Sequence, residues 1–163
     1  MNRFFRSAAT AAALVIAASA AQAGTTGSVN LSGSIGQSCN LTVVAQSIAS
    51  TLDLTATTAG TTVANVTENC NDKLGYNVSL ATTNGTTTGL FKGPSGNTDT
   101  LAYSVTYNGV AKTFTSGSVN ATTATARTAP GGVVKALAIA FTGTSTLNAD
   151  TYTDTLTLTM TAN

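Results

Sequence analysis

The chain has 163 residues, with 7 basic and 6 acidic side chains and neither histidine nor tryptophan. No segment carries the positive charge that would hold nucleic acid or an anionic membrane, so we exclude both as partners. Without histidine, and with the acidic residues scattered, there is no compact acid–base set and the usual zinc ligands are missing. We therefore expect no enzyme, no metal, no cofactor and no small-molecule substrate.

The first 23 residues have the layout of a secretory signal peptide. Arg3 and Arg6 precede an apolar run over residues 8–21, and Ala21-Gln22-Ala23 supplies small residues for cleavage. The run is too short to span a membrane, which takes about 20 residues. We expect an exported, single-domain chain that starts at Gly24. This mature chain has five basic and six acidic residues, so its net charge is −1.

An alternating segment opens the expected mature chain. Val29, Leu31, Gly33 and Ile35 share one side, and small polar residues occupy the other. Alternation of period two predicts a β-strand. The glycine has two interpretations: a kink in an ordinary first strand, or a missing side chain where another backbone approaches closely.

Two cysteines, Cys39 and Cys70, lie in the exported part. An even number of cysteines in an oxidising compartment predicts one disulfide. Closing a loop of about 30 residues would stabilise the fold by roughly 3 to 4 kcal/mol on the chain-entropy model. A redox or metal pair is the alternative interpretation, and the missing CxxC spacing counts against it.

The middle of the chain predicts short strands separated by turns. We expect strands at 40–44, 52–54, 63–66 and 74–80, the last with Leu74, Tyr76, Val78 and Leu80 on one face. Asn84-Gly85 favours a turn or belongs to a longer loop. Residues 115–128 show no apolar alternation, and Pro130-Gly131-Gly132 follows them, so we expect an exposed loop there.

Asn108-Gly109 predicts a β-hairpin over residues 101–114. A two-residue type I′ turn would place Tyr107 opposite Val110 and Tyr103 opposite Phe114. We expect these aromatic pairs to belong to the core rather than to a ligand platform.

Two further strands complete the pattern. Residues 133–141 alternate, with Lys135 expected near the exposed start of the strand. In the last strand Leu156, Leu158 and Met160 face one way and threonines the other, whereas Asp150 and Asp154 are expected to be solvated turn residues. Short strands without helical periodicity predict an all-β, immunoglobulin-like Greek-key sandwich.

The order of these features resembles the bacterial chaperone-usher pilins, the subunits of surface fimbriae. The likeness rests on the alternating segment before Cys39, on Glu68-Asn69-Cys70, and on the ending Tyr152-Thr153-Asp154-Thr155-Leu156. Together with Gly75-Tyr76-Asn77-Val78, this ending is similar to the spore coat protein U and archaic-type branch. The likeness covers essentially the whole mature chain.

The resemblance implies an incomplete immunoglobulin-like fold that is completed by donor-strand complementation. A periplasmic chaperone, and then the extension of the next subunit at an outer-membrane usher, would supply the missing strand. Val29, Leu31, Gly33 and Ile35 would be the donor residues, and Leu156, Leu158 and Met160 would line the acceptor groove. The implied parts are a signal peptide (1–23), a donor extension (24–36) and a pilin domain (37–163).

Two functions stay open at this point. The first is a homopolymeric fimbrial subunit, exported through the periplasm to the cell surface, that supports adhesion or biofilm formation. The alternative is a self-contained secreted β-sandwich that acts as a carbohydrate adhesin or as a spore or cell coat protein. The absence of tryptophan and the low aromatic content, 6% of residues, weaken the case for a sugar-stacking platform.

Overall fold

A computed structural model describes residues 26–163, so the predicted signal peptide and Gly24 lie outside the described residues. The chain divides into two units, residues 1–34 and 35–163. In the first unit, residues 26–34 belong to no helix or strand. All described strands belong to the second unit.

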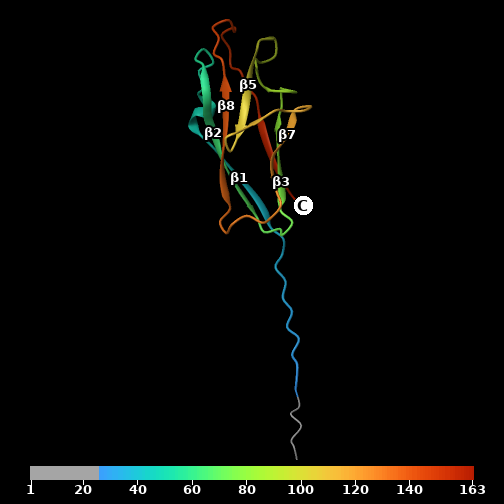
Figure 1. Cartoon of the computed structure of the whole chain (residues 1–163). Helices are drawn as coiled ribbons and strands as arrows, with labels where there is room; N and C mark the ends of the chain where they lie inside the picture. Colours follow the sequence, from blue (N-terminus) through green and yellow to red (C-terminus); the bar gives the residue numbers. More distant parts are fainter. Residues whose placement is uncertain (1–25) are drawn as a thin grey trace, which may run out of the picture. The chain divides into compact units, whose positions relative to one another are not determined.

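Residues 35–163 form two antiparallel sheets (Figure 1). In spatial order, the larger sheet contains β1 (Cys39–Ala45), β2 (Thr58–Cys70), β8 (Val133–Phe141), β5 (Thr100–Tyr107) and β4 (Gly89–Lys92), and β6 (Val110–Lys112) pairs with β5. The smaller sheet contains β7 (Ser118–Ala124), β3 (Tyr76–Thr82) and β9 (Leu156–Ala162). A short 3-10 helix, η1 (Ser47–Ser50), is the only helix in the described part of the chain.

The core lies between the inner faces of the two sheets. Val66, Val105 and Ile139 enter it from the larger sheet, and Val78 and Leu80 enter it from the smaller one. Alternate residues of a strand point to opposite faces, so the period-two pattern of the sequence becomes one buried layer. The predicted all-β sandwich is confirmed.

Cys39 and Cys70 form a disulfide. The two residues lie opposite each other in the register of β1 and β2, so the bond ties the start of β1 to the end of β2. Their separation of 31 residues closes a loop over η1 and most of β2. The structural interpretation of the two cysteines therefore agrees with the fold.

The predicted type I′ hairpin is present. Asn108 and Gly109 have φ angles of 51° and 76°, a conformation that asparagine tolerates and glycine adopts freely. Tyr107 lies opposite Val110 as predicted.

The predicted pair of Tyr103 and Phe114 is wrong. β6 ends at Lys112, and the backbone N–H of Phe114 donates instead to the carbonyl oxygen of Thr87, 3.2 Å away. Both aromatic side chains are nevertheless buried in the core.

The loop predicted over residues 115–128 is also wrong, because residues 118–124 form β7. Val119 and Ala121 face the core, and the residues around them are small and polar. Threonine has high strand propensity even where apolar alternation is missing. One paired neighbour, β3, is enough to hold this edge strand.

Two turns replace predicted strand residues. Residues 52–54 are not a strand, because the backbone N–H and hydroxyl of Thr55 both donate to the Asp53 carboxylate and close a turn. Leu74 is exposed ahead of β3, because Gly75 follows it with φ +91° and a backbone too close to Ala124 for a side chain. Asn84-Gly85 lies in a longer loop between β3 and β4.

A buried ion pair lies on the inner face of the larger sheet, where an exposed lysine was predicted. Lys135 on β8 lies 2.7 Å from the Glu68 carboxylate on β2, and the carboxylate is completely buried. Tyr76, Tyr107 and Thr122 donate hydroxyl hydrogen bonds to the same carboxylate at 2.7 to 2.8 Å. Burial raises the pKa of Glu68, but these bonds outweigh it and hold the pKa below its ordinary value. The cluster joins three strands of the larger sheet, β2, β5 and β8, to two strands of the smaller sheet, β3 and β7.

Replacing Lys135 with methionine should leave this carboxylate buried without its cation. We expect a loss of about 3 to 5 kcal/mol in the free energy of unfolding, measured by chemical denaturation. Lys92→Met, at an exposed lysine on β4, is the matched control. Equal effects of the two substitutions would contradict a stabilising role for the ion pair.

Candidate functional site

Each sheet ends in an edge strand that is paired on one side only, and these two edge strands lie near each other. In residues 26–163, β1 pairs only with β2, and β9 pairs only with β3. β1 and β9 contact each other without forming a ladder. A strand at a sheet edge presents free N–H and C=O groups that can pair with another chain. The sandwich is therefore open along this side.

An apolar groove lies between these two edges. It contains a cavity of about 200 Å³ whose walls come from Val43 and Ala45 on β1 and from Leu156 and Leu158 on β9. Its floor is the inner face of the larger sheet, including Leu137 and Ile139. We call this feature the edge groove. Its lining contains one charged residue, Asp154.

Exposure along the ladders shows that the core is uncovered at the edge groove. Val43 is 47% exposed, whereas its partner Val66 on β2 is completely buried. Leu158 is half-buried, whereas its partner Leu80 on β3 is completely buried. The residues face inward by the strand alternation, yet nothing in the described chain covers them. The core lacks one strand of apolar contacts here.

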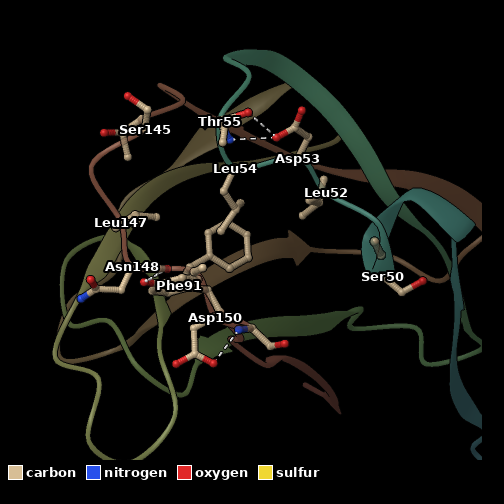
Figure 2. A pocket seen from close by; sticks show the side chains of 15 residues that line it. Ser50, Leu52, Asp53, Leu54, Thr55, Phe91, Ser145, Leu147, Asn148 and Asp150 are labelled. Carbon is tan, nitrogen blue, oxygen red and sulfur yellow. Dashed lines mark hydrogen bonds between the residues drawn. The ribbon is translucent and has the colours of Figure 1, made fainter.

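A second, larger cavity continues the edge groove at one end. It has a volume of about 560 Å³ and shares Ala49, Leu52 and Phe91 with the first cavity. Its remaining walls are the turn after η1 and the loop before β9. Figure 2 shows Leu54 and Phe91 pointing toward each other inside this second cavity. At its rim, Thr55 donates hydrogen bonds to the Asp53 carboxylate.

Asp154 fixes the start of β9 beside the edge groove. Its carboxylate accepts hydrogen bonds from the hydroxyls of Thr82 at 2.6 Å and Tyr103 at 2.7 Å. It also accepts bonds from backbone N–H groups, those of Thr83, Asn84, Leu90 and Thr155. The prediction of a solvated turn residue is wrong for Asp154, whereas Asp150 is exposed as predicted.

These hydrogen bonds set the protonation states of Asp154 and Tyr103. Burial raises the pKa of Asp154, but the bonds from Thr82, Tyr103 and the backbone outweigh it and lower the pKa below its ordinary value. Burial and the adjacent carboxylate raise the pKa of Tyr103. The carboxylate is therefore ionised and Tyr103 protonated at neutral pH.

The predicted site residues fall into two groups. Leu156 and Leu158 line the edge groove, whereas Met160 lies on the same face of β9 and packs against the core outside the cavity lining. The large apolar residues of the predicted donor segment are 83%, 91% and 92% exposed at Val29, Leu31 and Ile35. These residues and Gly33 lie in no described strand.

Sequence reasoning missed the β1 wall and the floor of the edge groove. Val43 belongs to the strand predicted at 40–44 and Ala45 follows it, but only the sheet order makes β1 an edge strand. Phe91 lies in the four-residue strand β4, which has no alternation long enough to notice. For Asp154 a signal existed, since it is part of the Tyr-x-Asp-Thr-Leu ending.

Residues 26–163 contain no cluster of histidine, cysteine, aspartate or glutamate side chains arranged for a metal ion. Over the same range, no helix has the length and apolar character needed to cross a membrane.

Comparisons with known proteins give a weak likeness in structure. No family profile matches the chain, and no curated protein matches it in sequence. Among solved structures, it is similar to the minor tip subunit of the E. coli Hda pilus, HdaB, with a TM-score of 0.38 and 12% identity. The match covers 74% of this chain and 79% of that one. A likeness this low carries no argument about function.

The bonds of Asp154 predict a stability that depends on pH. Because the folded pKa is lowered, its stabilisation is fully present above the ordinary aspartate value of about 3.9 and is lost as pH falls through the folded pKa. Asp154→Asn should lose about 2 kcal/mol at neutral pH, measured by urea denaturation, and approach the wild type in strong acid.

The matched control is Asp150→Asn, at an exposed aspartate in the same loop. A difference between Asp154→Asn and the wild type that stays constant down to strong acid would contradict this assignment.

Proposed function

We propose that this chain is a structural subunit of a bacterial surface fimbria, assembled by donor-strand exchange along the chaperone-usher route. The observation that carries the proposal is the edge groove, an uncovered strip of core between the edge strands β1 and β9. Such a groove offers main-chain hydrogen bonds to an added strand and apolar pockets to its alternate side chains. It has the chemistry of a docking site for an extended peptide.

The chain itself contains a segment of matching length and pattern. β9 has seven residues with Leu156, Leu158, Met160 and Ala162 facing inward. The segment from Val29 to Ile35 also has seven residues, with apolar side chains or glycine at every second position. Burying its valine, leucine and isoleucine would contribute about 1.5 to 3 kcal/mol each.

In this proposal the donor comes from another copy, and the product is a homopolymer. Within this proposal residues 1–23 are a signal peptide, 24–36 the donor extension and 37–163 the pilin domain. A periplasmic chaperone occupies the edge groove before assembly, and an outer-membrane usher catalyses the exchange. The fibre is displayed on the cell surface, where it supports adhesion or biofilm formation, and the subunit has no catalytic role.

The pattern of the sequence agrees with this proposal. The branch assignment, spore coat protein U or archaic type, rests on the sequence resemblance alone.

A second candidate function is favoured by the 560 Å³ cavity. Its volume falls within the range of small-ligand pockets, and Phe91, Tyr152 and Asp150 combine aromatic and polar groups in its lining. This would suit a self-contained module that binds a carbohydrate. A purified mature chain that stays monomeric and binds a glycan without any partner would favour this candidate over the fimbrial one.

Deleting residues 24–36 separates donor from acceptor. We expect the truncated chain to bind a chaperone, to stop polymerising, and to bind a synthetic peptide of residues 24–36, because the edge groove is intact and its occupant is gone. Size-exclusion chromatography and calorimetry measure these outcomes. A truncated chain that is a stable monomer and ignores the peptide would overturn the proposal.

The alternation of the peptide gives a sharper test that leaves the folded domain unchanged. Leu31→Asp in the peptide should weaken binding by more than about tenfold, because it removes one apolar burial and brings a charge into the groove. Asn30→Asp is the matched control, since residue 30 would point away from the core. If both peptides lose affinity equally, the predicted register is wrong.

A further inference from the structure

The outer face of the larger sheet carries no charged side chain over four adjacent strands. Asn65 on β2 lies between Val44 on β1 and Ala136 on β8 in the ladders. On the next row, Ala138 on β8, which is only 9% exposed between its neighbours, lies opposite the half-buried Thr106 on β5. These residues alternate with the buried Val66 and Leu137, so they point away from the core. We call the outward residues of β1, β2, β8 and β5 the neutral face.

Every charged residue of the described chain lies elsewhere. Glu68 and Lys135 are inside the core, Lys92 and Lys112 are on β4 and β6, and the others are in turns and loops. A surface with about 25 to 35% charged residues of both signs keeps a domain soluble and resists association, and the neutral face has none.

The side chains of the neutral face are also small and partly apolar. Its side chains are alanine, serine, threonine, asparagine and valine, so none is larger than valine or asparagine. Val44 and Val134 are 55% and 63% exposed on it. Side chains of this size let two sheets approach to the spacing of about 10 Å that packed sheets adopt.

We propose that the neutral face packs against the same face of a second copy and joins fibres side by side. A second copy is the occupant that meets this face without a mismatch of charge: two neutral faces bring no repulsion and leave no charge unpaired. The inference goes beyond the proposed function, and its lateral arrangement rests on that function.

The area of the neutral face indicates how strongly two copies would associate through it. Four strands about 4.8 Å apart and about seven residues long, at about 3.3 Å each, present about 440 Å² per copy. Two faces would bury about 900 Å², below the 1,200 to 2,000 Å² of stable complexes. Two single subunits therefore associate weakly, and the contact becomes strong only where a fibre repeats it many times.

The experiment compares two lysine substitutions in the full mature chain. Ala136→Lys places a charge in the middle of the neutral face, and Thr123→Lys places the same charge on the exposed outer face of the smaller sheet. Both positions point outward, and thermal unfolding checks that both variants fold. Bundling of assembled fibres is measured by turbidity and electron microscopy at low and high salt.

Wild type and Thr123→Lys should bundle at both salt concentrations, and Ala136→Lys should lose bundling while its individual fibres still form. Equal bundling of the two variants, or loss of wild-type bundling in high salt, would overturn the inference. If no fibre forms, the proposed function fails, and light scattering of concentrated subunits tests the neutral face by itself. A weak attraction between subunits that is lost only in Ala136→Lys would then support the inference. Equal attraction in the two variants would overturn it.

Discussion

The structure depends on one constraint: a β-sandwich must cover the inner face of each sheet, and here one strip of core has no strand over it. Val43 and Leu158 face inward from edges that the described chain leaves unpaired, although their ladder partners are completely buried. In the proposed function the missing element is a strand, because both free main-chain groups and apolar pockets are left over at the same place. A small molecule would satisfy the pockets but leave most of the backbone groups unpaired.

Polar contacts keep the rest of the sandwich in place around this opening. The Glu68 carboxylate accepts hydrogen bonds from hydroxyl groups of both sheets in addition to its ion pair with Lys135. It therefore fixes how the two sheets face each other. Asp154 performs a similar task at the open side, where it joins the start of β9 to β3, β4 and β5. Charge-assisted hydrogen bonds thus hold the strands around Glu68 and Asp154. Beside the edge strand β9, where the apolar cover is incomplete, such bonds take the place of apolar contacts.

The sequence was sufficient for the strands whose alternation is apolar and for the hairpin whose turn is Asn108-Gly109. It failed at β7, where threonine and serine replace the apolar signal, and at residues 52–54, where the Asp53 turn overrides strand-like spacing. At the site, the alternation of Leu156 and Leu158 predicted only one face of a strand, and the resemblance supplied their expected place in a groove. The opposite wall could not be found, since Val43 becomes part of the groove only through the order of strands in the sheets. Lys135 was misplaced for a related reason: its partner Glu68 is 67 positions away in the sequence and adjacent only in the folded sheet.

Hydrogen exchange of the backbone amides in β1 and β9 tests the central claim most directly. It should be measured on the chain lacking residues 24–36, with and without a peptide of those residues. The account predicts that alternate amides of β9, those that do not face β3, exchange rapidly in the truncated chain and become protected when the peptide binds. Amides of the central strand β3 should be protected in both cases. Protection of all β9 amides before the peptide is added, or no change after it binds, would contradict an open edge that accepts a strand.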